Sequence, residues 1–315
     1  MSHWSQSTWP SNYSINIEQT DCTDTNLRPT VSLITINAMP NKSISVICVI
    51  ALCFWHPEKL SAEDTSTFDW QYFEITGHKA FVILPDIPTA NRKDVPWVFY
   101  APTFDGRLPN AKDEGWMIKR FLAKGIAIAG VDIGESFGSP AGRLIYSALH
   151  QHLVTNLQFD TKTCLLARSR GGLMLYNWAA DNPEKIRCIA GIYPVCDLRS
   201  YPGLNRASTA YEMTAGELSE ALPKHNPIDR LAPLAKANVP IFHIHGDVDV
   251  VVPLEANSET VANRYRQLEG SIQLQIAPHQ GHNMWRGFFE CQPLVDFVIT
   301  HATAKLKVIP KVLTP

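Results

Sequence analysis

The chain has 315 residues, of which 45% are hydrophobic and 18% charged, and its formal net charge is -2. This balance suits one medium-large soluble domain with a substantial core. A charge so close to neutral argues against a basic surface for phosphates, and no nucleic-acid partner is expected.

The first 38 residues form a polar segment, rich in Ser, Thr and Asn, without hydrophobic periodicity. Such a composition does not support a packed core. We therefore expect residues 1–38 to be disordered or not translated, with Met39 as the true start.

Residues 39–62 have the three parts of a secretory signal peptide: a basic start, an apolar run over residues 44–55 and a small-residue cleavage site ending at Ala62. The run is too short to span a bilayer as a helix. We predict cleavage after Ala62, which leaves a secreted or periplasmic domain of residues 63–315 with no stable membrane insertion. Two alternatives stay open, an apolar helix of the fold and a retained membrane anchor.

Four of the seven cysteines lie in the predicted mature chain, at Cys164, Cys188, Cys196 and Cys291. They are too few and too scattered for a disulfide framework, and no C-x-x-C pair indicates structural zinc. Cys164 and Cys188 lie in apolar runs and are expected to be core thiols. One disulfide, involving Cys196 or Cys291, stays open for an exported protein.

Strands and helices alternate along the mature chain. Apolar or alternating runs predict strands at residues 68–76, 79–84, 97–101, 126–131, 164–167, 188–193, 240–245 and 272–276. Helical patterns cover residues 114–123, 141–157, 173–180, 255–268 and the region from 293 onward. The first two strands form an antiparallel hairpin, and the rest predicts an α/β fold: a mostly parallel sheet of about eight strands with helices on both faces.

Residues 194–239 interrupt this alternation. They contain Tyr201-Pro202-Gly203, a predicted helix over residues 215–221 and two further prolines. The segment is too long for a simple strand-to-helix loop. We therefore predict a small cap insertion at about residues 198–236, placed over the functional site.

The strand at residues 164–167 turns into a helix through Arg168-Ser169-Arg170-Gly171-Gly172. A Ser at a sharp strand-to-helix turn, with glycines where the backbone crowds, is typical of a nucleophile elbow. Ala167 stands where the usual pattern has its first Gly, and its small side chain keeps the turn possible. The alternative is an ordinary loop with a surface Ser.

A Ser hydroxyl needs a neighbouring base, and the base needs an orienting acid. Asp249 follows the strand at residues 240–245, and His282 follows the strand at residues 272–276. Ser169, Asp249 and His282 thus come in chain order, each after a strand. This order predicts a Ser–Asp–His triad at one edge of the sheet.

Other candidates stand close to these residues. Asp247 could replace Asp249, although its position better fits a capping role or contact with His245. His279 could replace His282 but lacks a preceding Gly. His243 and His245 alternate along their strand and are expected to be structural.

With these motifs, the chain from about residue 68 to residue 306 resembles the α/β-hydrolase superfamily. It is most similar to the prolyl-oligopeptidase-like and dienelactone-hydrolase-like branches, through the Ser169 elbow, the His-Gly-x-x-Asp-x-x-Val-Pro pattern that contains Asp249, and Gly281-His282. The resemblance implies that Ser169 is the nucleophile, Asp249 the acid and His282 the base.

An oxyanion hole is expected from the N–H of Arg170 and an N–H of the loop after residues 97–101. Pro102 has no N–H, which points to Thr103, with Phe104 as the alternative. The His-Gly sequence that the family carries in this loop is missing. Glucuronoyl esterases resemble the chain in placing an Arg directly after the catalytic Ser, where it assists the oxyanion.

Two hypotheses are open for the roles of Arg168 and Arg170. They brace the turn by pairing with carboxylates such as Glu135 or Asp132, or Arg170 meets an anionic substrate. The predicted substrate-binding residues are Arg170, Phe104, Trp285 and Tyr201. Tyr201 and Trp285 belong to a set of aromatic residues, with Tyr211 and Phe288, that could instead pack in the core.

These features predict an exported serine hydrolase that cleaves carboxylic esters, on carbohydrate or other small acyl esters, through an acyl-enzyme. No metal and no organic cofactor is expected. The alternatives are a prolyl-oligopeptidase-like serine peptidase, whose usual β-propeller this chain has no room for, and a non-catalytic binding protein of the same fold. The expected partner is therefore a small ester or a peptide.

Overall fold

The structure is a computed structural model, and it describes residues 68–86, 93–104 and 108–304. All of them belong to one compact unit, Leu60–Pro315. Residues 1–38 and the predicted signal peptide at residues 39–62 lie outside the described residues, so the expectations for them stay predictions. Among the described residues, no helix is long and apolar enough to cross a membrane.

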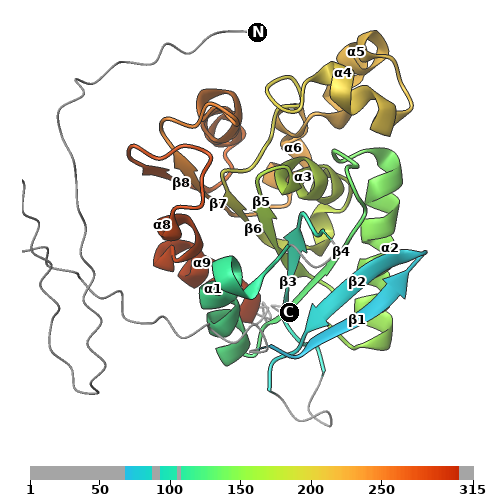
Figure 1. The fold of residues 1–315 in the computed structure, drawn as a ribbon, viewed down its shortest axis with the longest axis vertical. Coiled ribbons are helices and arrows are strands. Elements are labelled where there is room, and N and C mark those ends of the chain that lie inside the picture. The colour runs from blue at the N-terminus through green and yellow to red at the C-terminus, as the bar shows by residue number, and fades with distance from the viewer. Residues whose placement is uncertain (1–67, 87–92, 105–107, 305–315) are drawn as a thin grey trace, which may run out of the picture. The chain divides into compact units, whose positions relative to one another are not determined.

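One sheet of eight strands organises this unit (Figure 1). Its strands are β1 (Trp70–Ile75), β2 (His78–Ile83), β3 (Trp97–Ala101), β4 (Ala127–Val131), β5 (Thr163–Arg168), β6 (Ile186–Ile192), β7 (Ile241–Gly246) and β8 (Ile272–Ala277). Their order in the sheet is β1-β2-β4-β3-β5-β6-β7-β8. The β1–β2 hairpin joins β4 antiparallel, whereas all pairs from β4 to β8 are parallel.

Helices cover both faces of the sheet. The described α-helices of five or more residues are α1 (Ala111–Ala123), α2 (Pro140–Asn156), α3 (Gly171–Asp181), α5 (Ala215–His225), α6 (Ala232–Lys236), α7 (Thr260–Gln267) and α9 (Gln292–Thr303). Buried side chains of α2, α3, α6 and α7 form one core with the sheet, and those of α1, α9 and the short α8 (Arg286–Phe289) form the other. The predicted α/β architecture, a mostly parallel sheet of eight strands with helices on both faces, is confirmed.

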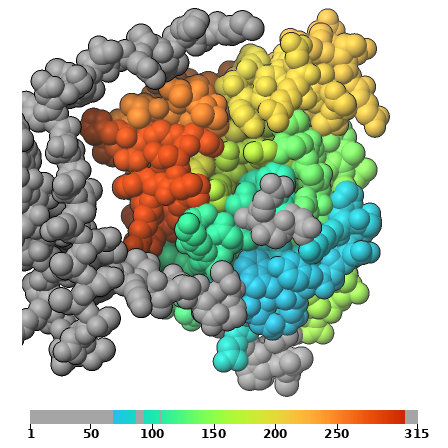
Figure 2. Space-filling view, viewed as in Figure 1, coloured from blue at the N-terminus to red at the C-terminus, as the bar shows by residue number. Residues whose placement is uncertain are grey.

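The segment predicted as a cap lies between β6 and β7. It contains α5, α6 and the four-residue helix α4 (Leu204–Ala207). Its apolar side chains form a third cluster with Leu173 of α3 and Phe137 of the loop after β4. In the space-filling view this yellow segment forms one corner of the described surface, away from the cyan β1–β2 hairpin (Figure 2).

The four cysteines of the described residues are all free and buried. Cys164 and Cys188 face each other from β5 and β6, as expected for core thiols. A disulfide involving Cys196 or Cys291 is therefore ruled out within the described residues.

Candidate active site

The turn after β5 holds Ser169 in a strained conformation. Its φ is +50°, in the left-handed region that a residue with a Cβ rarely adopts. The turn is closed by hydrogen bonds to the Ser169 carbonyl from the backbone N–H groups of Gly172 (2.9 Å) and Val195 (2.8 Å). The Ser169 N–H donates to the Ile192 carbonyl oxygen at 3.0 Å, so the backbone is fixed on both sides of the Ser169 side chain.

The two glycines of the turn are required by space. A Cβ added at Gly171 would lie 2.0 Å from the carbonyl oxygen of Ala101, and one at Gly172 would lie 2.2 Å from that of Val195. Both distances are far inside van der Waals contact. Strand β3 and the segment after β6 thus approach the start of α3 so closely that only glycine fits.

Ser169, His282 and Asp249 come together at the carboxyl ends of β5, β8 and β7. Ser169 Oγ lies 2.8 Å from His282 Nε2, and His282 Nδ1 lies 2.8 Å from Asp249 Oδ2. The His282 side chain is 17% exposed and that of Asp249 is fully buried. Such an arrangement allows His282 to take the Ser169 proton while Asp249 holds the imidazole by its other nitrogen.

Asp249 remains ionised despite its burial. Burial by itself raises the pKa of a carboxyl group. The neighbouring His245, with Nε2 at 3.5 Å from Oδ2, and hydrogen bonds from His282 and the backbone N–H of Val252 outweigh it and hold the pKa of Asp249 well below its ordinary value. Oδ1 accepts from the N–H groups of Val251 (3.0 Å) and Val252 (2.8 Å), which leaves Oδ2 for His282.

Behind Asp249, a chain of buried side chains fixes the loop after β7. Tyr176 Oη lies 2.6 Å from His243 Nε2, and Ser258 Oγ lies 3.0 Å from His243 Nδ1 and 2.7 Å from His245 Nδ1. His245 Nε2 lies 2.8 Å from the carbonyl oxygen of Val252, which can only accept, so this nitrogen carries the proton. Ser258 therefore donates to His245, and His243 and His245 are structural, as expected.

The two N–H groups expected to bind the oxyanion are those of Arg170 and Thr103. Ala101 of β3 pairs with Ala167 of β5, so Thr103 and Ser169 each lie two residues beyond this pair. Arg170 is the N-cap of α3. Among the described residues, no acceptor pairs with the backbone N–H of Arg170 or Thr103. The role of either group as an oxyanion donor stays a prediction.

Both arginines beside Ser169 pair with carboxylates. Arg170 pairs with Glu135 of the loop after β4, and its guanidinium lies 5.1 Å from the Phe104 ring centroid. Arg168 pairs with Glu114 of α1 at 2.5 Å, so the expectation of Glu135 or Asp132 holds for Arg170 only. Because α1 packs on the face of the sheet toward which the Arg168 side chain points, its acidic residue is the nearer one.

The Arg170–Glu135 pair lies at the surface. The two side chains are 31% and 34% exposed. Glu135 uses Oε1 for the pair, and its Oε2 is buried without a hydrogen-bond partner among the described residues. A pair that is partly exposed and incompletely bonded can exchange partners at a lower cost than a buried one.

The other predicted residues lie as follows. Asp247 Oδ1 accepts from the His279 N–H at 2.6 Å, which is a capping role, and neither side chain contacts Ser169. Trp285 is 41% exposed and packs edge-on against Phe288. Tyr201 packs against the third apolar cluster, so its described contacts are those of a packing residue.

Tyr193 is a site residue that the sequence analysis did not single out. It directly follows β6, has a φ of +35°, and its ring centroid lies 4.4 Å from that of His282. An apolar strand ending in Tyr-Pro was the available signal, but a buried Tyr at a strand end is usually a core residue.

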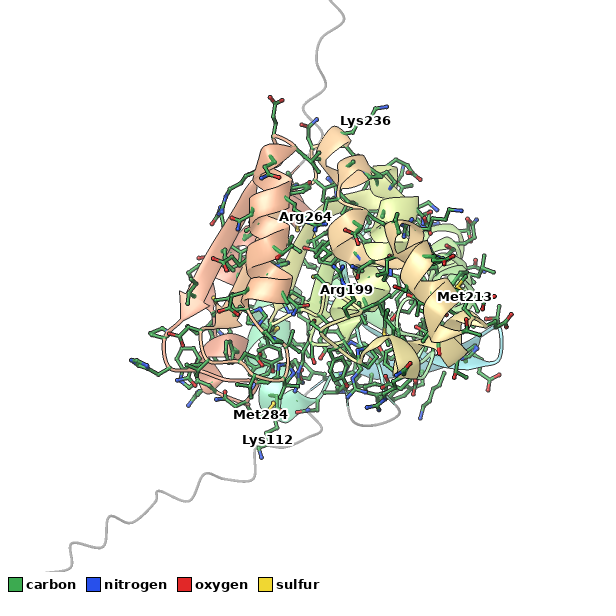
Figure 3. All side chains as sticks on the ribbon, turned by 90° about the horizontal axis from the view of Figure 1, so that it is seen from above. Lys112, Arg199, Met213, Lys236, Arg264 and Met284 are labelled. Atoms are coloured by element: carbon green, nitrogen blue, oxygen red, sulfur yellow. The ribbon has the colours of Figure 1, made fainter. Side chains whose placement is uncertain are left out.

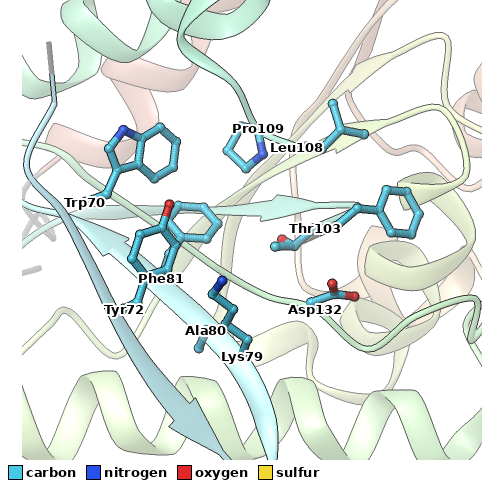
Figure 4. Close-up of a pocket in the computed structure, with 10 residues that line it drawn as sticks. Trp70, Tyr72, Lys79, Ala80, Phe81, Thr103, Leu108, Pro109 and Asp132 are labelled. Carbon is cyan, nitrogen blue, oxygen red and sulfur yellow. The ribbon is translucent and has the colours of Figure 1, made fainter. Parts of the chain in front are cut away.

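A pocket lies beside the expected oxyanion loop, between the β1–β2 hairpin and the segment after β3 (Figure 4). It is lined by Trp70, Tyr72, Lys79, Ala80, Phe81, Thr103, Phe104, Leu108, Pro109 and Asp132. Phe104, which the Arg170 guanidinium approaches at 5.1 Å, connects it with the vicinity of Arg170. Its lining is mainly apolar and aromatic.

Comparisons with known proteins agree with this architecture. The sequence model of the prolyl oligopeptidase family matches residues 146–298, which include Ser169, Asp249 and His282. No curated protein matches the chain significantly. The chain is an α/β-hydrolase by fold, and the predicted resemblance to the prolyl-oligopeptidase-like branch is confirmed.

Solved structures share the fold at low sequence identity. A putative dipeptidyl aminopeptidase IV from Bacteroides ovatus has a TM-score of 0.58 and 16% identity, over 75% of this chain and 35% of that chain. An acylaminoacyl peptidase from Pyrococcus horikoshii has a TM-score of 0.58 and 15% identity, over 76% of this chain and 42% of that chain. An S-formylglutathione hydrolase from Agrobacterium tumefaciens has a TM-score of 0.56 and 16% identity, over 74% of this chain and 93% of that chain.

Proposed function

We propose that this protein is a serine hydrolase in which Ser169 is the nucleophile, His282 the general base and acid, and Asp249 the group that orients His282. The observation that carries the proposal is the continuous hydrogen-bonded series Ser169 Oγ–His282 Nε2–His282 Nδ1–Asp249 Oδ2, with 2.8 Å at each contact between residues. It places one base within reach of one hydroxyl, as general-base catalysis requires.

The reaction would run in two halves. Ser169 Oγ attacks the acyl carbon while its proton passes to His282 Nε2, and the carbonyl electrons move to the oxygen, which the N–H groups of Arg170 and Thr103 stabilise. The tetrahedral intermediate collapses, and the leaving group departs with the proton of His282. Water then attacks the acyl-enzyme, its proton passes to His282 and on to Ser169, and the acid is released.

Short peptides are the substrate class that we put first. The support is the match to the prolyl oligopeptidase family model across the three residues of the triad. It is strengthened by structural neighbours described as a dipeptidyl aminopeptidase and an acylaminoacyl peptidase. The preference for carboxylic esters, expected from the sequence alone, has less support and becomes the second candidate.

One observation favours the ester candidate. The S-formylglutathione hydrolase is covered over 93% of its chain, whereas the two peptidases are covered over 35% and 42% of theirs. The present domain therefore corresponds to nearly the whole of that hydrolase and to a part of each peptidase.

The substrate contacts that we propose start from Arg170. Glu135 and Phe104 hold its guanidinium one residue from the nucleophile, and Arg170 is partly exposed. A planar guanidinium retains donors on its remaining edge and can bind a carboxylate there. On the His282 side, we propose that the exposed aromatic residue Trp285 contacts the substrate. Tyr201 is proposed to contact a part of the substrate farther from the nucleophile.

A matched pair of substrates tests the choice between amide and ester. Aminoacyl and dipeptidyl p-nitroanilides are compared with p-nitrophenyl esters that carry the same acyl groups, each rate being divided by its uncatalysed rate. The peptidase proposal predicts an acceleration for the amide at least as large as for the ester. Ester turnover without amide turnover would favour the second candidate, and intact, folded protein without any turnover would favour a binding role.

A further inference from the structure

We propose that Arg168 is a positioning residue that holds His282 in line with Ser169, by fixing the loop that carries His282 and the aromatic side chains that pack beside the imidazole. The inference rests on the proposed function, because it concerns the base of that reaction. Arg168 contacts neither the nucleophile hydroxyl nor the imidazole in the described structure. It acts through Met284 and through Phe289, which packs on Tyr193, and Glu114 anchors it.

The anchor of Arg168 is a fully satisfied buried carboxylate. Glu114 is 0% exposed, and its Oε1 accepts from Arg168 Nη1 at 2.5 Å and from the Tyr100 hydroxyl at 2.7 Å. Its Oε2 accepts from the Asn110 N–H at 3.0 Å. Since Arg168 supplies the opposite charge, the pair fixes the guanidinium in one place between β5 and α1.

From this anchor, Arg168 reaches the loop that carries His282. Its Nη2 lies 3.0 Å from Met284 Sδ, two residues beyond His282, and its guanidinium lies 4.8 Å from the Phe289 ring centroid. Met284 is 48% exposed, so little else packs against it. Figure 3 shows Met284 on the same side of the molecule as Lys112, at the start of α1. Arg168 therefore connects α1 with the loop of the base.

Arg168 also fixes the ring that packs on His282. It does so through Phe289, whose ring centroid lies 4.8 Å from the guanidinium and 6.4 Å from the ring centroid of Tyr193. The Tyr193 ring centroid in turn lies 4.4 Å from that of His282. Burial raises the pKa of Tyr193 to about 12, although Arg168 acts in the opposite direction, so the phenol is neutral at working pH. By holding the loop of His282 at Met284 and the ring packed on its imidazole through Phe289, Arg168 limits the movement of the imidazole.

The shape and charge of an arginine side chain suit this positioning role better than those of lysine. Three partners, Glu114, Met284 and Phe289, surround one guanidinium, which offers five N–H donors in a fixed plane and a flat face for the aromatic ring. Lysine would offer one compact ammonium and could not reach all three partners at once. The guanidinium also stays charged: desolvation lowers the pKa of Arg168, but its neighbours, with Glu114 as the counter-charge, hold this pKa above its ordinary value.

The alternative is that the Arg168–Glu114 pair only stabilises the fold. A second pair in the chain serves as the control. Arg187 of β6 pairs with Asp160, and the side chains are 13% and 16% exposed, close to the 11% of Arg168. Arg187 lies at the start of β6, at the amino end of the parallel strands, whereas Ser169 follows the carboxyl end of β5. Loss of this pair should affect stability without affecting the site.

The test uses charge-neutral double variants, because Arg168→Met alone would leave Glu114 buried and unpaired. E114Q/R168M, R168K and the control D160N/R187M are compared with wild type for kcat, KM, Tm and the rate of inactivation by a fluorophosphonate. We expect E114Q/R168M to fold and to lose about 100-fold in kcat and in inactivation rate, with KM within about twofold. R168K should lie between it and wild type.

The outcomes separate this inference from the proposed function. Wild-type kcat and inactivation rate in folded E114Q/R168M would overturn the role of Arg168 and leave the triad intact. An equal loss in D160N/R187M would also overturn it, because the effect would then follow general stability. If the fluorophosphonate does not label wild type at all, the proposed function fails, and the inference fails with it.

Discussion

Ser169 has its backbone at a φ of +50°, and in this conformation its Oγ lies 2.8 Å from Nε2 of His282. The strain and the contact have one origin. The chain must leave β5 and begin α3 within a few residues, and only a left-handed residue makes this turn while pointing its side chain out of the sheet. The fold therefore keeps a strained serine at the point where its hydroxyl meets the base.

The first prediction follows from this strain. Ser169→Gly should raise the free energy of unfolding by about 1 kcal/mol relative to Ser169→Ala, because glycine adopts a positive φ without a Cβ penalty. Both variants should be inactive. Urea unfolding of the two proteins measures the difference. An Ala variant as stable as the Gly variant would show that the turn is not strained.

The second prediction concerns space in the same turn. Gly171→Ala should destabilise the protein by several kcal/mol or prevent folding, since the added Cβ would lie 2.0 Å from the Ala101 carbonyl oxygen. Gly216→Ala is the matched control. It lies in α5, where the new Cβ meets only Thr214 Oγ1 at 3.9 Å, and helix propensity predicts a gain of up to about 1 kcal/mol. Thermal unfolding compares both with wild type.

The third prediction distinguishes the two aspartates of the loop after β7. Asp249→Asn should reduce kcat by about 10⁴-fold, because an amide can donate to His282 Nδ1 and favour the wrong tautomer. Asp247→Asn should change kcat less than about threefold, since Asp247 only accepts from the exposed His279 N–H. Steady-state kinetics measures both. A large loss in Asp247→Asn with an active Asp249→Asn would reverse the assignment of the acid.

The fourth prediction concerns pH. Burial, followed by the neighbouring His245, lowers the pKa of His243 from 6.5 to about 3. As the pH falls from 6.5 towards 3, the unfolded chain takes a proton at His243 that the folded protein does not, so stability falls.

His243→Gln cannot titrate and can still bond Tyr176 and Ser258. As the pH falls, the unfolding free energy of this variant should therefore decrease less steeply than that of wild type. The two slopes should differ by up to about 1.4 kcal/mol per pH unit. Urea unfolding at several pH values between about 7 and 4 measures the slopes. Equal slopes in wild type and variant would contradict a neutral, buried His243.

The sequence predicts the sheet well because its strands are continuous apolar runs. The strand at residues 97–101 has the same bounds in the structure as in the prediction, and the hairpin and mostly parallel order are confirmed. Helix bounds differ more: α1 begins at Ala111, three residues early, because Asn110 caps it by accepting from the Asp113 N–H. The positions of strands and helices can therefore be predicted from local hydrophobic patterns and from the motifs at strand ends.

The partners of side chains were harder to predict. Nothing local connects Arg168 with Glu114, which lies 54 residues away in the chain. Tyr193 and His282 likewise meet only because β6, β7 and β8 are neighbours in the sheet. Such contacts depend on how helices pack on the sheet, and a single sequence does not state that packing.

The central claim is that His282 activates Ser169 for attack on an acyl carbon. Covalent labelling by a fluorophosphonate, with the modified residue identified by mass spectrometry, tests it most directly. The account predicts labelling of wild type on Ser169, none in Ser169→Ala, and labelling slowed by at least about 100-fold in His282→Gln. Labelling on another residue, or equal rates in wild type and His282→Gln, would contradict it.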